Sequence, residues 1–335
     1  MKFVKIKQKH IGSDRLREVI RRFQEDLENR GVEFNLSTTV KDLKYDRGRI
    51  TEVETSKGTF PCDYVIWAPG RKGSLNSTSL YDRLGLKYFF NPIDIGVRVE
   101  FPSSLMREIV EEYECWDPKV YIRTPTFDDK VRTFCTCPYG YVTIESYEDS
   151  LRGVNGYSKF KKWSDNTNFA LLVTVGLTQP LNDTTEYGRR IAHVANILGG
   201  GKPLLQRYGD LRRGRRSKPE SIKENHVKPT LSLDEVTPGD IGLAYPYRLV
   251  LDIKEELEKL NNIIPGIAED STLLYGPEVK FYSRRIETVE KKGFRTLQTS
   301  IQNLFVAGDG SGYSRGIVGA AWTGIIAARG IKSLD

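Results

Sequence analysis

The chain has 335 residues, a formal net charge of +7 and an apolar fraction of 39%, which are typical of a soluble protein with room for two domains. No run of eighteen apolar residues occurs, so we expect no membrane-spanning helix. Its four cysteines and three histidines are too few and too scattered for a disulfide framework or a zinc site. This cysteine content favours a reducing, cytoplasmic location.

The chain begins with alternating charged and bulky residues at Met1–His10, which predict a strand. Ser13–Arg30 predicts a helix because its apolar residues recur every three or four positions and Gly31 follows as a stop signal. Val32–Leu36 then predicts a short strand that returns to a sheet.

Three short strands separated by turn residues are expected next, at Val40–Tyr45, Ile50–Thr55 and Thr59–Cys62. They predict a β-meander. The meander leads into Tyr64–Ala68, a continuous apolar strand of the kind found in sheets covered on both faces, which stops at Pro69-Gly70.

From about Asn91 onward, the sequence pattern predicts a second sheet whose strands are separated by polar loops. We expect the following strands of a second sheet: Ile95–Glu100, Thr133–Cys137, Tyr141–Glu145 and Ala170–Val175. Helices are expected at Thr185–Leu198 and Val250–Leu260. The basic stretch Gly209–Pro229 predicts a long irregular surface loop.

The signature of a buried central strand returns at Ile301–Val306, before a glycine cluster and a small-residue helix that starts near Ile317. Residues 1–90 and 300–335 are therefore expected to share one sheet, with residues 91–299 inserted as a substrate or cap domain. The predicted fold class is α/β with an α+β insertion.

The glycine cluster is the first candidate site. Asp309 follows a buried strand, at the sheet edge where open α/β sheets bind ligands, and it could accept hydrogen bonds from ligand hydroxyls. Unpaired N–H groups at the start of the last helix favour an anion. The alternative is a ligand-free corner in which Asp309 caps a turn. The candidate residues here are Gly308, Asp309, Gly310, Gly312, Gly316, Ile317 and Val318.

Other polar or reactive residues each allow two interpretations. Cys135 and Cys137 are expected to be small buried residues, although a catalytic dithiol is the alternative despite the unusual Cys-x-Cys spacing. Arg98 either faces a substrate carboxylate or lies on the polar face of an edge strand. Ser164–Asn168 either lines a substrate pocket or forms a turn, and Arg315 could bind a phosphate or a substrate anion. No catalytic residue can be assigned.

Six segments occur in the order found in one known family: Gln8–Leu16, Ala68–Gly70, Ile95–Glu100, Phe134–Gly140, Ser164–Val173 and Ala307–Tyr313. Together they resemble a family of uncharacterised FAD-dependent dehydrogenases, which is similar in architecture to glutathione-reductase-like flavoproteins. The chain departs from the family pattern at Pro69, where threonine is usual, and at Tyr139, where glycine is more frequent.

The resemblance implies a partial FAD-binding domain with a β-meander and a mixed-sheet substrate domain. It implies FAD as cofactor, a small-molecule substrate, and contact of the flavin ring and ribityl chain with Ala68, Pro69, Gly70, the Gly308–Gly312 loop and the last helix. The chain is then a flavin-dependent oxidoreductase, or the carboxy-terminal portion of one.

The sequence lacks the Gly-x-Gly-x-x-Gly turn that holds the pyrophosphate of FAD in such proteins, and a second such turn for NAD(P)H is also absent. We therefore expect a truncated product or a separate amino-terminal FAD-binding polypeptide. One alternative is a non-catalytic or partner-dependent subunit that binds no FAD alone. A nucleic-acid-binding protein using Arg207–Lys218 ranks lower, because no aromatic residues are interleaved with the basic run Arg212–Lys218.

Overall fold

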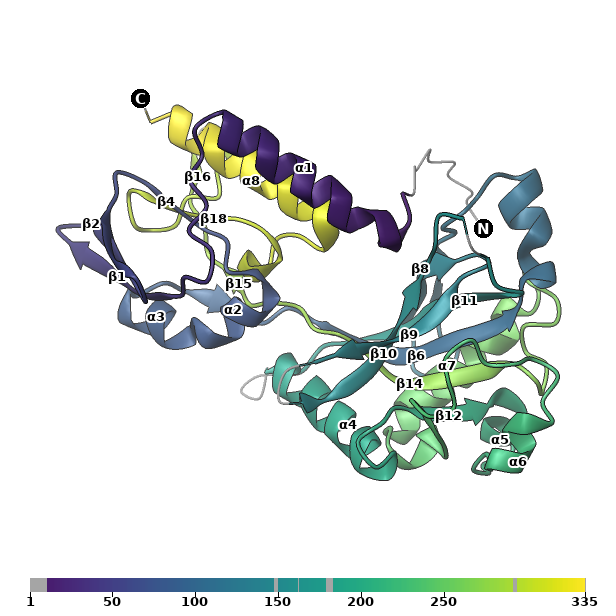
Figure 1. Ribbon diagram of the computed structural model, residues 1–335. Helices are drawn as coiled ribbons and strands as arrows, with labels where there is room; N and C mark the ends of the chain where they lie inside the picture. Colours follow the sequence, from purple (N-terminus) through teal and green to yellow (C-terminus); the bar gives the residue numbers. More distant parts are fainter. Residues whose placement is uncertain (1–10, 148–149, 162, 179–182, 292–293, 335) are drawn as a thin grey trace. The chain divides into compact units, whose positions relative to one another are not determined.

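The computed structural model describes residues 11–147, 150–161, 163–178, 183–291 and 294–334, and the strand predicted at Met1–His10 lies outside them. The chain forms two compact units, coloured along the sequence in Figure 1. The large unit comprises Met1–Asn29, Ile93–Val175 and Glu186–Lys280, and the small unit comprises Arg30–Pro92, Gly176–Thr185 and Phe281–Asp335. The domain boundaries expected at residues 90 and 300 stay a prediction.

The large unit is built on a sheet whose strand order is β13-β12-β14-β6-β11-β8-β7. All neighbours are antiparallel except β12 and β13. The strands are β6 (Ile93–Pro102), β7 (Tyr121–Arg123), β8 (Lys130–Cys137), β11 (Asn166–Val175), β12 (Leu204–Arg207), β13 (Thr237–Pro238) and β14 (Leu273–Lys280). The predicted strands at residues 95–100, 133–137 and 170–175 lie within this sheet.

A hairpin of β9 (Tyr141–Ser146) and β10 (Arg152–Tyr157) packs against the sheet, as does helix α7. Nearly every residue of β6, β11 and β14 is buried, because both faces of these central strands are covered. The helices of this unit are α1 (Leu16–Asn29), α4 (Thr184–Leu198), α5 (Tyr208–Arg212), α6 (Pro219–Lys223) and α7 (Tyr247–Leu260), with short helical turns at Ser13–Arg15, Ser103–Met106, Glu108–Glu112 and Ile241–Leu243.

The small unit contains the predicted meander, formed by β1 (Val40–Asp46), β2 (Arg49–Thr55) and β3 (Gly58–Pro61). Beside it, β4 (Val65–Trp67) and β18 (Leu304–Val306) pair in parallel. Short pairs join β5 (Tyr88–Phe89) to β15 (Arg285–Ile286) and β16 (Glu290–Lys291) to β17 (Phe294–Arg295). The helices are α2 (Gly70–Asn76), α3 (Thr78–Arg83) and α8 (Gly316–Lys332), with a helical turn at Asp309–Ser311.

The two faces of β18 belong to different cores, as the alternation of a strand requires. Leu304 and Val306 join the cluster that contains residues of the meander and α3. Phe305 packs instead with Ala327 of α8, which runs along this strand in Figure 1. A small-residue helix can approach a strand closely, so α8 holds the glycine cluster at the carboxyl ends of β4 and β18.

Two predicted elements differ in the structure. Val32–Leu36 is not a strand, because no described strand pairs with it, and the side chains of Val32, Phe34 and Leu36 are 45%, 40% and 64% exposed. The predicted irregular loop at residues 209–229 contains α5 and α6. Arg212 and Arg213 form ion pairs with Asp270, so part of its positive charge is neutralised locally.

Candidate functional site

The structure brings together the two glycine-containing loops that were singled out in the sequence. A Cβ atom placed on Gly310 would lie 2.5 Å from the carbonyl oxygen of Gly70 and 2.8 Å from its nitrogen. Gly310 is therefore in direct backbone contact with Gly70, and only glycine allows this approach. The Ala68–Gly70 and Gly308–Gly312 loops form one surface at the carboxyl ends of β4 and β18.

Three further glycines leave the backbone of this surface uncovered. Gly70, Gly308 and Gly316 have φ angles of 67°, 72° and 76°, and a Cβ atom on any of them would meet nothing within 4 Å. A side chain is excluded there by conformation rather than by crowding. Open backbone beside a strand end is what the close approach of a ligand requires.

Gly312 has a different role in the same loop. Its φ is 77°, and a Cβ atom on it would lie 2.5 Å from the Cα atom of Arg285. The carbonyl oxygen of Gly312 accepts a hydrogen bond from the Asn91 side chain at 3.1 Å. Gly312 therefore anchors the loop inside the small unit.

The carboxylate of Asp309 lies at the start of α8. One of its oxygens accepts a hydrogen bond from the Gly316 N–H group at 3.0 Å, and the other accepts one from the Ser314 hydroxyl at 2.9 Å. Asp309 thus holds the turn that leads into α8 and accepts from the first N–H group of that helix, whose N-cap residue is Arg315. Each carboxylate oxygen keeps further lone pairs, so Asp309 can still accept hydrogen bonds from ligand hydroxyls.

Thr323 of α8 supports the glycine loop, and the sequence analysis did not identify it. Its hydroxyl oxygen accepts a hydrogen bond from the Gly308 N–H group at 2.7 Å, while the hydroxyl donates to the Ala320 carbonyl. Thr323 is 6% exposed, so this bond is shielded from water. The signal in the sequence was a hydroxyl residue among the small and apolar residues that precede Arg329 in this helix.

The first turn of α8 is open to solvent. Ile317 and Val318 are 56% and 83% exposed, and Ala68 is also exposed, whereas Pro69 is half-buried. The guanidinium of Arg315 lies over the ring of Tyr282. Arg315 is exposed at the helix start, so an anion could still reach it.

These residues fit the flavin and ribityl portion of FAD. The uncovered backbone at Gly70, Gly308 and Gly316 can lie against a flat ring, and Asp309 can accept from a polyol chain. The amino end of α8 carries partial positive charge, which suits an anionic group. No described loop offers the glycine turn that would hold a pyrophosphate.

Arg98 is not on an edge strand, contrary to one of its two interpretations. It lies on β6 in the middle of the seven-stranded sheet and is fully buried. Its Nε atom is 2.9 Å from Glu278 of β14, and the Glu278 carboxylate is also 3.0 Å from Lys280. Arg98 therefore does not lie on an exposed polar face. Its charge is part of a buried ionic cluster with Glu278 and Lys280.

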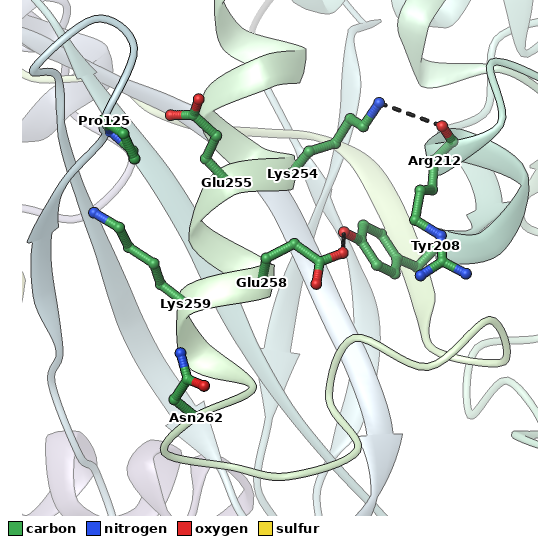
Figure 2. A pocket seen from close by; sticks show the side chains of 8 residues that line it. All are labelled: Pro125, Tyr208, Arg212, Lys254, Glu255, Glu258, Lys259 and Asn262. Atoms are coloured by element: carbon green, nitrogen blue, oxygen red, sulfur yellow. Dashed lines mark hydrogen bonds between the residues drawn. The ribbon is translucent and has the colours of Figure 1, made fainter.

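The large unit also has two surface hollows that contain none of the residues predicted to contact the flavin. Figure 2 shows the first, of about 370 Å³, where Tyr208 donates a hydrogen bond to Glu258 at 2.6 Å and Lys254 donates to the Arg212 carbonyl at 3.3 Å. The second, of about 380 Å³, includes Arg207 and His226. In the first hollow the hydrogen bonds link lining residues to one another.

Among the described residues, no helix is long and apolar enough to cross a membrane. Within the same residues, no three His, Cys, Asp or Glu side chains are grouped as a metal site would require.

Comparison with known proteins gives two family matches. Residues 92–281 match the family described as FAD-dependent protein, C-terminal domain-like. Residues 8–91 match the pyridine nucleotide-disulphide oxidoreductase family. The chain is also similar to an uncharacterized protein of Clostridium beijerinckii, with 26% identity over 343 residues.

That similarity covers 96% of the chain but 61% of the length of the relative. The first family match alone includes more than half of the 335 residues. It coincides with the seven-stranded sheet and its covering elements, and the second match contains the meander and β4. The chain therefore belongs to the FAD-dependent oxidoreductase family whose members carry this C-terminal domain.

Proposed function

We propose that the chain is the flavin-holding and substrate-selecting portion of an FAD-dependent dehydrogenase. The small unit would hold the flavin ring and ribityl chain, and the large unit would select a small-molecule substrate. The direct packing of Gly310 on Gly70 is the observation that carries the proposal, because it joins two loops far apart in the sequence into one glycine-lined surface.

When bound, FAD supplies the two-electron chemistry of such enzymes. The residues of the chain orient and stabilise it. The backbone of Ala68–Gly70 and Gly308–Gly312 would lie against the ring, and Asp309 would accept hydrogen bonds from the ribityl hydroxyls. The amino end of α8 would favour negative charge at the pyrimidine end of the ring. The hydrogen bond from the Gly308 N–H group to Thr323 would occupy this donor, so it would not bind the ligand.

We further propose that a separate amino-terminal FAD-binding polypeptide or segment binds the ADP half. The small unit exposes a set of apolar side chains that such a segment could cover: Val32, Phe34, Leu36, Ile66, Ile317, Val318, Trp322 and Ile325. Three of them alternate along residues 32–36, which lack a partner strand within the described chain. An added strand would pair with that segment and bury its apolar residues.

The second candidate is a subunit that binds no flavin by itself. It is favoured by Asp309, whose two oxygens already accept hydrogen bonds from Ser314 and Gly316. This candidate predicts that the purified chain alone leaves the absorbance spectrum and fluorescence of added FAD unchanged.

Competition binding tests the flavin proposal. FAD fluorescence is titrated with the purified chain, and FMN or ADP is added as competitor. We expect FMN to compete about as well as FAD and ADP to have no effect, because only the flavin and ribityl side is held here. Competition by ADP alone would show that the glycine surface binds the other half of the cofactor.

Gly316→Val provides a matched substitution test. Valine strains a backbone with φ of 76° and places its branches over the open surface, so FAD affinity should fall at least tenfold. Gly48→Val is the control, since Gly48 also has a positive φ of 87° and open surroundings, but lies in the turn between β1 and β2. Equal loss of FAD affinity in both variants would contradict the assignment.

A further inference from the structure

Cys135 lies in a β-bulge near the end of β8, and Cys137 is the last residue of that strand. Asn168 of β11 is opposite Cys137, and Ala170 is opposite Phe134, so two residues of β8 oppose one residue of β11. Cys135 is in the left-handed region, with φ of 51°. A bulge changes the direction of a side chain and is frequent next to active sites.

The two cysteines lie close together, and they differ in solvent exposure. The Cys137 thiol donates a hydrogen bond to the Cys135 carbonyl oxygen at 3.6 Å. Cys137 is 3% exposed, whereas Cys135 is only half-buried. Cys135 is therefore the more exposed of the two residues, and Cys137 is enclosed.

Charged groups surround the half-buried thiol. Arg98 of β6 donates a hydrogen bond to the Cys135 carbonyl at 2.9 Å, and Glu278 and Lys280 of β14 complete the cluster, with Glu145 of β9 bonded to Lys280 at 3.1 Å. The hydrogen bond from Cys137, followed by the positive charges of Arg98 and Lys280, lowers the pKa of the Cys135 thiol to about 6, although burial and Glu278 act in the opposite direction.

The pKa of Cys137 is raised well above its ordinary value, first by its hydrogen bond with Cys135 and then by burial. The other two cysteines, Cys62 and Cys115, behave as ordinary shielded thiols, because burial raises the pKa of both. The pKa of Cys135 is thus lowered while the pKa values of the other three cysteines are raised, which is not expected of a cysteine that serves only as a small packing residue.

Polar groups without partners lie at the same place. Asn168 is fully buried, and neither its amide nitrogen nor its amide oxygen has a hydrogen-bond partner in the described part of the chain. A Cβ atom on Gly156 would lie 2.6 Å from the Cys137 sulfur, 2.9 Å from Nη1 of Arg98 and 3.0 Å from Oδ1 of Asn168. Glycine at 156 thus lets a thiol, a guanidinium and an unsatisfied amide converge.

We propose that Cys135 and Cys137 form a redox-active dithiol that reacts with a low-molecular-weight disulfide, with Cys135 as the attacking thiolate and Cys137 as the resolving thiol. The site lies wholly in the large unit. It does not depend on the flavin proposal, so either can fail without the other.

The reaction balances without a further oxidant. The Cys135 thiolate attacks one sulfur of R–S–S–R, the S–S bond breaks, and R–S⁻ leaves and takes up a proton. Cys137 then loses its proton and attacks the Cys135 sulfur of the mixed disulfide, which releases the second R–S⁻ as a thiol. The two cysteine thiols are oxidised to one disulfide, and the added disulfide is reduced to two thiols.

The test treats the full chain with hydroxyethyl disulfide, quenches it with iodoacetamide, and identifies the cysteine peptides by mass spectrometry. We expect a Cys135–Cys137 disulfide, recognised by the loss of two hydrogens, while Cys62 and Cys115 are recovered as alkylated thiols. Cys137→Ser should trap the mixed disulfide on Cys135, and Cys135→Ser should abolish the reaction. The double variant C62S/C115S is the control that should react as the wild type does.

Alkylation rates give an independent measurement. At pH 7, Cys135 should react with iodoacetamide roughly tenfold faster than Cys62, because its larger thiolate fraction outweighs its lower nucleophilicity. Cys137→Ala should move the midpoint of the Cys135 pH profile upward, since the main stabilising hydrogen bond is lost. Equal rates for Cys135 and Cys62 in the wild type, or no disulfide between the pair, would overturn the proposal whether or not the variants fold.

Discussion

The packing of the Gly308–Gly312 loop on Gly70 depends on the absence of a side chain at Gly310. The contact between the Gly308–Gly312 loop and Gly70 needs backbone atoms closer than any Cβ atom permits. The glycine cluster alone could not distinguish this packed glycine from Gly308 and Gly316, which have open surroundings and need glycine for their positive φ angles. The same residue type therefore performs two different tasks in one loop.

Gly310→Ala tests the contact at this residue. The new methyl group would push the loop away from Gly70, so we expect a loss of about 1–3 kcal/mol in the free energy of unfolding, as for overpacked sites, together with weaker FAD binding. Gly324→Ala in α8 is the control, because its Cβ atom meets nothing within 4 Å and should stabilise the helix by up to about 1 kcal/mol. Urea denaturation compares the two. A neutral Gly310→Ala variant would contradict the packing.

Helix α7 illustrates the conflict between an amphipathic pattern and burial. Its sequence is rich in charged residues, yet Asp252 and Glu256 are fully buried, and their carboxylate oxygens have no hydrogen-bond partner among the described residues. Burial raises the pKa of Glu256 to about 7 and that of Asp252 to about 6. The helix therefore packs most favourably when these carboxyl groups are protonated.

The raised pKa of Glu256 makes stability depend on pH. Between its ordinary value of 4.5 and about 7, the folded state binds more protons than the unfolded state, so the free energy of unfolding falls as pH rises through this window. Glu256→Gln should remove part of this dependence. We expect it to stabilise the protein by on the order of 1–2 kcal/mol at pH 8 and by little at pH 4.5. Urea denaturation at both pH values checks this, and an equal effect at both would exclude the mechanism.

At the scale of the whole molecule, the two proposed activities belong to different compact units. Every residue proposed to contact the flavin lies in the small unit, and both cysteines of the proposed dithiol lie in the large unit. Two of the four tryptophans belong to each unit, with Trp67 and Trp322 in the small one and Trp116 and Trp163 in the large one. Their fluorescence can therefore follow each unit separately.

Binding of FAD should stabilise the small unit. In the variant W116F/W163F, whose fluorescence reports the small unit, FAD at about 100 times its dissociation constant should add roughly 2.7 kcal/mol to the free energy of unfolding. In W67F/W322F, which reports the large unit, the urea transition should move much less. Equal shifts in both variants would show that the flavin does not act through the small unit alone.

The elements with strong local periodicity could be predicted from the sequence. The meander, α4, α7, α8 and the central strands of the larger sheet occur where hydrophobic spacing and turn residues predicted them, because those signals depend on neighbours close in the chain. The ordered segments also identified the family, which the family matches confirm.

Tertiary structure decided whatever depends on a partner distant in the sequence. Val32–Leu36 has the alternation of a strand but forms none, since a strand needs a second strand to pair with. Arg98 looked like a residue of an edge strand, and its burial became visible only when Glu278 was placed beside it. Likewise, Gly310 contacts Gly70, and Cys135 contacts Arg98, although each pair is far apart in the chain. Local sequence patterns do not predict contacts of this kind.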